Sequence, residues 1–154
     1  MTAACEPSAD DAPGQRSPVS TTVQLRRLLG ICDPRANWPW DCEAPEPSDL
    51  QRMLSSNLEV AIPVGPHGTP ADHIGRILYL ARHGWQDAVE IDVGIPCLGY
   101  PGPEWPLIDG NHRVWAAALR GDEVIEVAIA GQVDHAAELL GVTEEAICGS
   151  RTQA

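Results

Sequence analysis

The segment 109–113, Asp-Gly-Asn-His-Arg, brings together in one turn the residue types that bind anions. It follows a short apolar segment, residues 105–108, and precedes an alanine-rich segment, residues 114–120, with helical character. A glycine lets the backbone approach a ligand closely, and the free N–H groups at the start of a helix favour negative charge. Histidine and arginine side chains add donors that suit phosphate. The segment therefore predicts a phosphate-binding turn between a strand and a helix.

Two basic side chains of this turn have both a binding and a structural interpretation. Arg113 lies one turn into the expected helix, where its guanidinium can hold two phosphate oxygens at once. The alternative for this residue is a salt bridge to Asp109 or Asp92. His112 either donates to a phosphate or transfers a proton near neutral pH, and its alternative is a purely structural role.

The other residues of the turn supply backbone and a carboxylate. Gly110 is required for the turn itself, and Asn111 is expected to offer its backbone N–H and its side-chain amide to the ligand. Asp109 has an ordinary explanation as the N-cap of the helix. Because a carboxylate beside a polyphosphate repels it unless Mg²⁺ or a proton intervenes, the alternative makes Asp109 a Mg²⁺ ligand or a catalytic base.

Residues outside the turn are candidates to complete the site. Glu90 and Asp92 share one face of an expected strand, so they form either a solvated face or a metal ligand and base, with Glu90 preferred. His73 and Arg76 share the start of an expected helix, where they either reach a second phosphate or are solvated. Trp85 is expected in the core, and its alternative is stacking on a base.

Composition narrows the classes of function. The chain has 154 residues and a formal net charge of -12, and all ten of its basic residues are arginine. The lack of lysine excludes a P-loop and a lysine nucleophile. The acidic balance argues against DNA as a partner and suits a protein partner instead.

Residues 1–18 and the rest of the chain show no targeting or membrane signal. The start is polar and acidic, without the basic residues and apolar stretch of a secretory signal, and no apolar run approaches the roughly 20 residues that span a bilayer. We therefore expect a cytoplasmic protein without a membrane partner. Five cysteines without a close-spaced pair argue against a disulfide framework.

Prolines divide the chain into three parts. Ten of the 14 prolines precede residue 71, which indicates a proline-rich, partly disordered N-terminal arm over residues 1–57, with short helices at 23–31 and 48–55. A domain is expected over residues 58–142, followed by a C-terminal tail over residues 143–154.

Hydrophobic periodicity predicts the elements of the domain. Apolar residues at helical spacing indicate a helix from 72 to 83 with Asp72 as its N-cap, and alternation indicates a strand from 88 to 93. Residues 94–103, rich in glycine and proline, are expected to form a loop. The other expected elements are strands at 58–64, 107–108 and 123–130, and helices at 114–119 and 132–140. This order predicts an α+β fold, a small mixed β-sheet with surrounding helices.

The order of elements and three motifs resemble the ParB/sulfiredoxin superfamily, in particular its ParB N-terminal-like domains. Residues 62–64, Ile-Pro-Val, resemble the opening strand, and residues 76–91 resemble the helix, glycine and next strand entry. Residues 109–113, with the alanines that follow and the strand 124–129, resemble the Gly-x-x-Arg box. The resemblance covers residues 58–131 and implies a ParB/sulfiredoxin-like fold.

In that superfamily the box holds nucleotide phosphates at the start of a helix. The resemblance therefore implies that Gly110, Asn111, His112 and Arg113 bind a nucleoside triphosphate, with Mg²⁺ as a second cofactor. Sulfiredoxins carry a catalytic cysteine where this chain has Asn111, and ParB proteins continue into basic DNA-reading helices where this chain has a short acidic end. Neither sulfinic acid reduction nor partition-site binding is expected.

The sequence thus predicts a nucleotide- or phosphate-binding protein. If it is an enzyme, we expect a metal-assisted NTPase or phosphotransferase, with Asp109, His112 and Glu90 as catalytic candidates and Asp109 as the metal ligand. The alternative is a non-catalytic regulatory or protein-interaction module. A ParB-like nuclease conflicts with the charge balance, because ten arginines hardly supply a basic groove.

Overall fold

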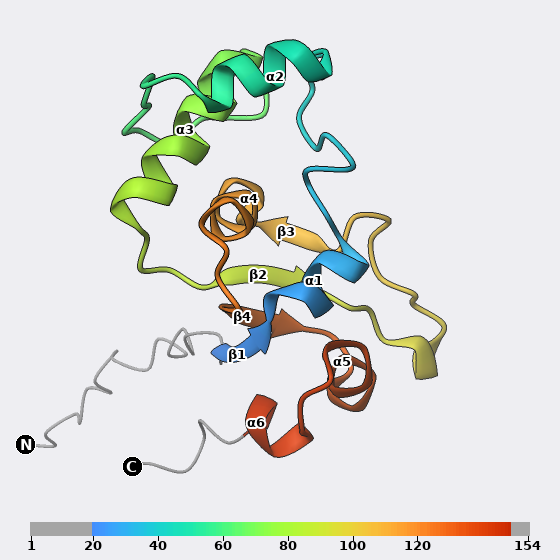
Figure 1. Cartoon of the computed structure of the whole chain (residues 1–154). Coiled ribbons are helices and arrows are strands. Elements are labelled where there is room, and N and C mark those ends of the chain that lie inside the picture. The colour runs from blue at the N-terminus through green and yellow to red at the C-terminus, as the bar shows by residue number, and fades with distance from the viewer. Residues whose placement is uncertain (1–19, 149–154) are drawn as a thin grey trace, which may run out of the picture.

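A mixed β-sheet lies at the centre of the computed structural model, which describes residues 20–148 (Figure 1). In this part of the chain the strands are β1 (Ser20–Gln24), β2 (Val89–Asp92), β3 (Leu107–Asp109) and β4 (Val124–Ala130). They lie in the order β1-β4-β2-β3; β4 is parallel to β2 and antiparallel to β1, and β2 is antiparallel to β3. The predicted α+β class with a small mixed sheet is confirmed.

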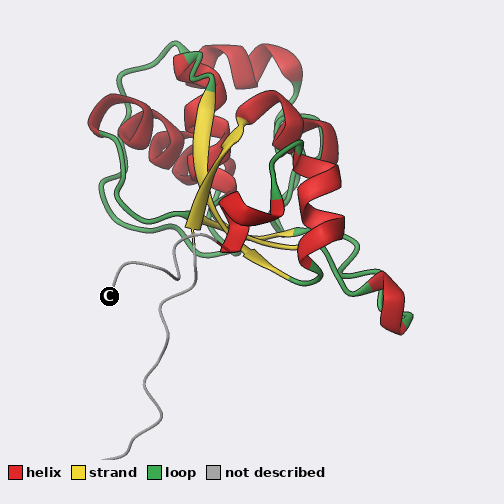
Figure 2. Cartoon of the chain, turned by 90° about the horizontal axis from the view of Figure 1, so that it is seen from below, coloured by secondary structure: helices red, strands yellow, loops and turns green. Residues whose placement is uncertain are grey.

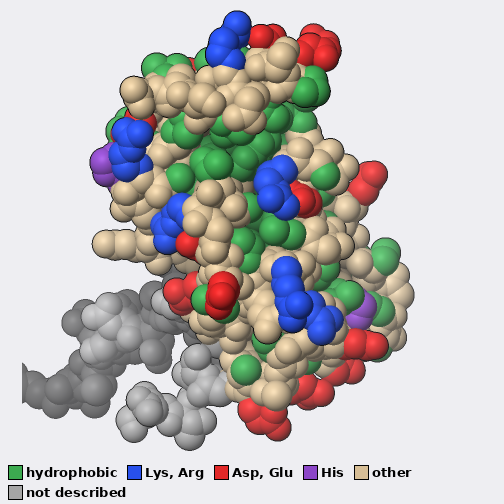
Figure 3. Space-filling view, viewed as in Figure 1, with side chains coloured by type: hydrophobic (Ala, Val, Ile, Leu, Met, Phe, Trp, Pro, Cys, Tyr) green, Lys and Arg blue, Asp and Glu red, His purple; other side chains and the backbone are tan. Residues whose placement is uncertain are grey.

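Helices lie on both sides of this sheet. The helices above it in Figure 1 are α2 (Pro47–Leu54), α3 (Pro70–His83) and α4 (Asn111–Arg120), and α3 packs against both others. Those below it are α5 (Val133–Leu140) and α6 (Glu144–Cys148). The helix α1 (Leu25–Ile31) continues directly from β1 and contacts both α4 and α5. Figure 3 shows acidic side chains gathered at the lower end of the molecule, where α6 begins with two exposed glutamates.

Two groups of buried side chains hold the layers together. The larger surrounds the sheet and includes Val89 and Ile91, which alternate with exposed Glu90 as the sequence predicts. The smaller lies between α3 and α4 and includes Ile77 and Trp115. It also takes in Trp40, from the segment between α1 and α2, so this segment closes one side of the α3–α4 pair.

Most of the predicted elements are confirmed within one or two residues, including the helix at 72–83, which is α3. Its N-cap differs from the prediction. Thr69 caps the helix by accepting the N–H of Asp72, while the Asp72 carboxylate accepts the N–H of Thr69. This reciprocal pair is a capping box, so Asp72 holds the third helical position and is not the N-cap.

The opening strand lies elsewhere than predicted. Residues 58–64 form no strand; they run beside α3, where the Val60 N–H donates to the Gly75 carbonyl at 3.0 Å. The edge position next to β4 belongs to β1, in which Val23 is the buried residue. Residues 20–57, predicted as an arm, therefore supply a strand and two helices to the layers of the fold.

The ends of the chain are described only in part. The predicted tail at 143–154 begins with α6, whose Ile147 is buried in the larger core. The predicted disorder of residues 1–18 lies outside the described residues, as does the rest of the tail after residue 148. Among residues 20–148, no helix is long and apolar enough to cross a membrane.

The loop over residues 94–103 is confirmed as a loop and projects from one end of the sheet (Figures 1 and 2). Its base is narrow, because a Cβ on Gly94 would lie 2.3 Å from the Gly102 nitrogen. Ile95 and Tyr100 then exchange backbone hydrogen bonds of 2.7 and 3.2 Å. Beyond this bridge a short 3₁₀ turn, Pro96–Leu98, forms the tip, with the Leu98 side chain 78% exposed.

Candidate functional site

The predicted turn joins the edge strand β3 to α4. Gly110 is the residue before the helix and has φ +110°, a conformation that favours glycine. A Cβ at this position would also lie 2.6 Å from Cγ1 of Val89, so both the backbone angle and the space require glycine. No side chain caps α4, which means that the prediction of Asp109 as N-cap is wrong. The first N–H groups of α4 are therefore left without the usual side-chain acceptor.

Arg113 ties this turn to the entry of β2. Its Nη1 donates to the carbonyl oxygens of Asp87 and Ala88 at 2.7 and 2.8 Å, and its Nη2 pairs with the Asp109 carboxylate. The Arg113 side chain is only 14% exposed, whereas that of Asp109 is 64% exposed. The salt-bridge alternative is confirmed with Asp109 as the partner. Asp92 instead accepts the backbone N–H of Gly94 at 2.8 Å.

His112 pairs with His73, which is buried, while His112 itself is half-buried. Its Nε2 lies 2.9 Å from Nδ1 of His73, a hydrogen bond between α4 and α3. His73 is fully buried, so the expectation that it is solvated is wrong. The Trp40 ring stacks on both imidazoles, with centroid distances of 4.4 Å to His73 and 4.7 Å to His112. The two rings and the tryptophan form one stack inside the smaller core.

This environment favours the neutral form of both histidines. Burial, followed by the charges of His73 and Arg76, lowers the pKa of His112 to about 3. Burial also lowers the pKa of His73, although the nearby Asp72 carboxylate opposes this effect. In the protein without ligand, this low pKa disfavours proton transfer by His112 near neutral pH, and its catalytic role stays a prediction.

A cavity of about 280 Å³ opens beside the turn. Three residues of the predicted turn that were assigned to the ligand, Gly110, His112 and Arg113, line it together with Arg76 of α3. The remaining lining residues are Pro63, Val64, Leu80, Trp85, Asp87 and Asp109. The structure thus brings together the start of α4, two arginines and a histidine, and it places Arg76 in the site.

Asn111 does not contribute its side chain to this cavity. Its Oδ1 accepts the indole N–H of Trp105 at 3.0 Å, and Asn111 is not among the residues that line the cavity, so the predicted contact of its amide with a ligand stays a prediction. Trp85 borders the cavity, and the Arg120 guanidinium lies over its ring at 5.0 Å from the centroid. Because a cation already covers one face of Trp85, only the other face of the ring is open for stacking on a base.

Glu90 lies on the other side of the Arg113–Asp109 pair. The antiparallel pairing of β2 and β3 sets it opposite Asp109, as the predicted neighbourhood of strand and turn requires. It borders a separate hollow of about 370 Å³, which also includes Glu126 and does not include His112. The structure therefore divides the three predicted catalytic residues between two hollows, with Asp109 in the wall between them.

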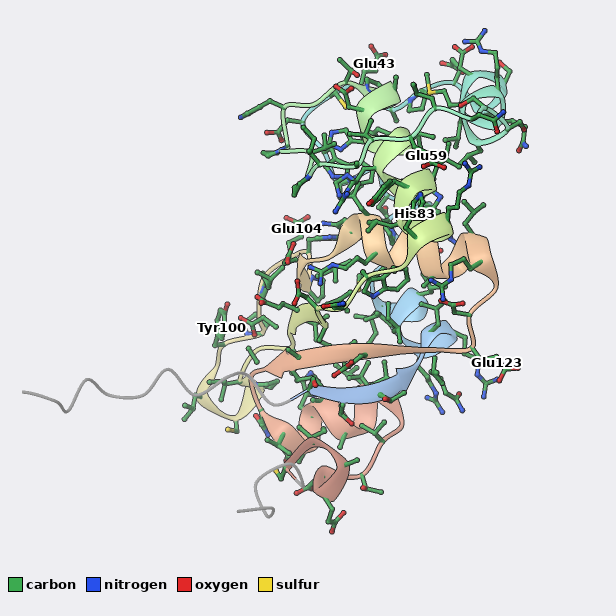
Figure 4. All side chains as sticks on the ribbon, turned by 90° about the vertical axis from the view of Figure 1, so that its left-hand side faces the viewer. Glu43, Glu59, His83, Tyr100, Glu104 and Glu123 are labelled. Carbon is green, nitrogen blue, oxygen red and sulfur yellow. The ribbon has the colours of Figure 1, made fainter. Side chains whose placement is uncertain are left out.

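Other titratable side chains outside the cavity have structural roles. His83 and Arg82, at the end of α3, both pair with Glu59, which lies beside His83 in Figure 4. Burial, with a smaller contribution from the Asp33 charge, raises the pKa of Cys32 to about 11 and so makes its thiol unreactive. Among residues 20–148, no three His, Cys, Asp or Glu side chains are grouped so as to hold a metal ion.

Sequence reasoning missed the histidine pair and Trp40. A signal for His73 exists, because positions 73, 77 and 80 follow helical spacing and the latter two are buried apolar residues. A histidine on the apolar stripe of a helix is expected to need a buried partner. No local pattern identifies His112 as that partner, since the two residues are 39 positions apart.

Comparison with known proteins identifies no relative of this chain. No protein-family model, curated protein or solved structure matches this chain. The resemblance to the ParB/sulfiredoxin superfamily therefore remains a prediction from the sequence motifs.

Proposed function

We propose that the protein binds a small phosphate-bearing ligand in the cavity at the start of α4. The single observation that supports this most strongly is the composition of the cavity wall: an uncapped helix start at Gly110, together with Arg76, Arg113 and His112. Helix starts carry a partial positive charge of roughly half an elementary charge, which favours an anion.

The charge around the cavity differs from that of the whole chain. Arg76 and Arg113 balance Asp87 and Asp109 in the wall, whereas the chain carries a formal net charge of -12. Adding the helix start leaves this cavity locally positive within an acidic protein. Arg76 donates to the carbonyl oxygen of Ala61 through Nη1, and a guanidinium has five N–H donors in all, so donors remain for a ligand.

The size of the cavity limits the ligand. Its volume of about 280 Å³ lies at the lower end of the roughly 300–1,000 Å³ typical of small-molecule pockets. A phosphate group with part of its ester fits this space better than a whole nucleotide. A nucleoside triphosphate therefore places its terminal phosphate here and leaves its base outside the cavity.

A second candidate function follows from the bonds of Arg113. Its guanidinium already holds two carbonyl oxygens and a carboxylate, so the turn is also complete as a structural device. In this case the protein is a non-catalytic module, and its acidic surface serves a protein partner. The two candidates differ in a measurable property, which is affinity for phosphate.

Calorimetric titration with inorganic phosphate, ATP, CTP and GTP, each with and without Mg²⁺, tests the proposal. Mg²⁺ is varied because Asp87 and Asp109 stand beside the expected phosphate. Arg76→Ala is expected to weaken binding by about tenfold or more, since a charge-assisted hydrogen bond is worth ~1.5–3 kcal/mol. Arg52→Ala, on α2 and outside the cavity wall, removes the same charge and is expected to have no effect.

The outcomes separate the candidates. Binding by the wild type that is weakened by Arg76→Ala supports the phosphate site, and release of inorganic phosphate from a bound triphosphate adds hydrolytic activity. Binding without turnover indicates a ligand-controlled switch. If the wild type binds none of the four compounds, the phosphate proposal is wrong and the structural module stands.

A further inference from the structure

The histidine pair beside the cavity shares a single hydrogen bond between two neutral rings. His73 Nδ1 and His112 Nε2 are 2.9 Å apart, so one of these atoms carries a hydrogen and the other accepts it. Which atom donates depends on what each ring meets at its second nitrogen. The second nitrogens are Nε2 of His73 and Nδ1 of His112.

The surroundings of His73 indicate where its hydrogen lies. Its Nε2 is buried and has no hydrogen-bond partner within good geometry, and it faces the turn at Gly68. Nδ1 is engaged by His112, so the backbone of Gly68 and Pro66, whose hydrogen bonding raises the pKa of His73, is assigned to the Nε2 side of the ring, where Gly68 lies. A carbonyl favours a hydrogen on the nitrogen that faces it. We therefore place the His73 hydrogen on Nε2, which leaves Nδ1 as an acceptor.

This assignment fixes the state of His112. Its Nε2–H donates to His73, and its Nδ1 consequently carries a lone pair and no hydrogen. Among residues 20–148, Nδ1 of His112 has no protein hydrogen bond. Because Nε2 is engaged by His73, Nδ1 is the ring nitrogen that His112, a residue of the cavity wall, has left for a ligand, whereas the helix start and the arginines of the wall are donors. A lone pair repels a phosphate oxygen, so a bound anion requires a hydrogen at this nitrogen.

The stack around His112 accommodates the additional charge. Trp40 lies nearly parallel to the His112 ring, 24° between planes, so its π face meets the imidazole. An aromatic face attracts a cation in this position. A bound anion adds a second attraction for the charged ring and offsets the burial that favours the neutral form in the empty cavity.

We propose that each anion bound in this cavity brings one proton from solvent with it, held on His112 Nδ1 against the ligand, while His73 fixes the orientation of the ring. The inference rests on the proposed phosphate site and adds its regulation: affinity falls as pH rises. Proton uptake converts neutral His112 to its imidazolium form, which then donates from both nitrogens, to the ligand and to His73.

Near His112, its partner His73 is the other group that could make the affinity for an anion depend on pH between 5.5 and 7.5. Arg76 and Arg113 keep their charge throughout this range. His67 is 85% exposed and lies next to Asp41, outside the cavity wall. The charged and titratable groups that act on the pair are Asp72, His73 and Arg76 from α3, Asp109 from β3 and Arg113 from α4.

Sulfate is the decisive probe because it remains a dianion throughout this pH range and brings no proton of its own. Calorimetric titration in two buffers of different ionisation enthalpy, at pH 5.5, 6.5 and 7.5, measures the protons taken up per sulfate. We expect uptake approaching one proton and a Kd that rises about tenfold per pH unit while the bound form stays protonated. Inorganic phosphate, which can carry the proton itself, is expected to depend less steeply on pH.

Two variants separate the role of His112 from that of histidines elsewhere. His112→Asn supplies an amide donor that does not titrate, so it is expected to bind sulfate with an affinity independent of pH. His135→Gln, on α5 and outside the cavity wall, is expected to retain the wild-type pH dependence. An NMR titration of the wild-type His112 ring, with and without saturating sulfate, gives an independent readout, and its pKa is expected to rise on binding.

The results discriminate between this inference and the proposed function. Sulfate binding without proton uptake, or an unshifted His112 titration with sulfate bound, overturns the inference alone. The inference is also wrong if the sulfate Kd of His112→Asn changes with pH as steeply as that of the wild type. Absence of binding by either anion to the wild type overturns the phosphate site, and the proton coupling falls with it.

Discussion

Arg113 and Asp109 form an ion pair whose two partners contribute unequally to stability. Replacing Arg113 with alanine removes both hydrogen bonds to the carbonyls of Asp87 and Ala88, and the guanidinium is only 14% exposed. A hydrogen bond to a charged donor is worth ~1.5–3 kcal/mol, and two that share one nitrogen together give ~2–4 kcal/mol. Asp109→Asn removes only the contact of a carboxylate that is 64% exposed, which is worth at most about 1 kcal/mol.

The assay is urea unfolding of the wild type, Arg113→Ala, Arg113→Lys and Asp109→Asn, followed by tryptophan fluorescence. We expect the free energy of unfolding to fall by ~2–4 kcal/mol for Arg113→Ala and by at most about 1 kcal/mol for Asp109→Asn. Lysine is expected to recover part of the loss, because it keeps the charge but cannot reach all three acceptors in a fork. Equal losses for Arg113→Ala and Asp109→Asn would show that the carbonyl bonds contribute nothing.

Two further predictions concern the turn and the histidine pair. Gly110→Ala combines a positive φ with a Cβ placed 2.6 Å from a side chain of β2, so a loss of ~2–5 kcal/mol is expected. Gly121→Ala, at the other end of α4, has a positive φ but open space and is expected to lose only ~1–2 kcal/mol in the same unfolding assay; equal losses would refute the contact. His112, with a folded pKa of about 3, takes up its proton at higher pH when unfolded. Stability is therefore expected to fall by about 1.4 kcal/mol per pH unit as pH drops below ~6.5, and less steeply in His112→Asn; parallel curves for the two proteins would contradict a buried neutral histidine.

Elements with a strong period are predictable from this sequence. The helix α3 is apparent because Ile74, Ile77, Leu78 and Ala81 recur at helical spacing; the first two are buried and the last two pack, partly buried, against the smaller core. The strand β2 is apparent because Val89 and Ile91 alternate with charged residues. In both cases the core lies on one side of the element, so the hydrophobic pattern directly reflects the packing.

Elements with little burial are not predictable in this way. The edge strand β1 has one fully buried residue, Val23, so it shows no period. Residues 58–64 contain Val60, Ile62 and Val64, which are typical of strands, yet Ile62 is 71% exposed and the segment lies against α3 without a strand partner. Tertiary pairing, which sequence neighbours do not encode, decides both outcomes.

The candidate site shows the same division. Gly110, His112 and Arg113 form one continuous motif, and the cavity lies beside them as the sequence suggests. His73 and Trp40 reach the same place from distant segments, because α3 packs on α4 and the segment before α2 folds over both. The neutral state of His112 depends on that packing and therefore has no signature in the motif itself.

The tip of the projecting loop, residues 94–103, can be altered with little effect on the stability of the folded core. Its base is locked where Gly94, Gly102 and Gly131 pack backbone against backbone, and the Ile95–Tyr100 bridge closes it before the tip begins. Beyond this base the tip is also held by an exposed hydrogen bond, from the Cys97 N–H to Oε1 of Gln132 at 3.0 Å, so insertions after Cys97 add little loop entropy and remove no buried contact. Residues 98 and 99 are thus a natural position for an epitope or a fluorescent label, and a region where sequences can diverge without disturbing the rest of the chain.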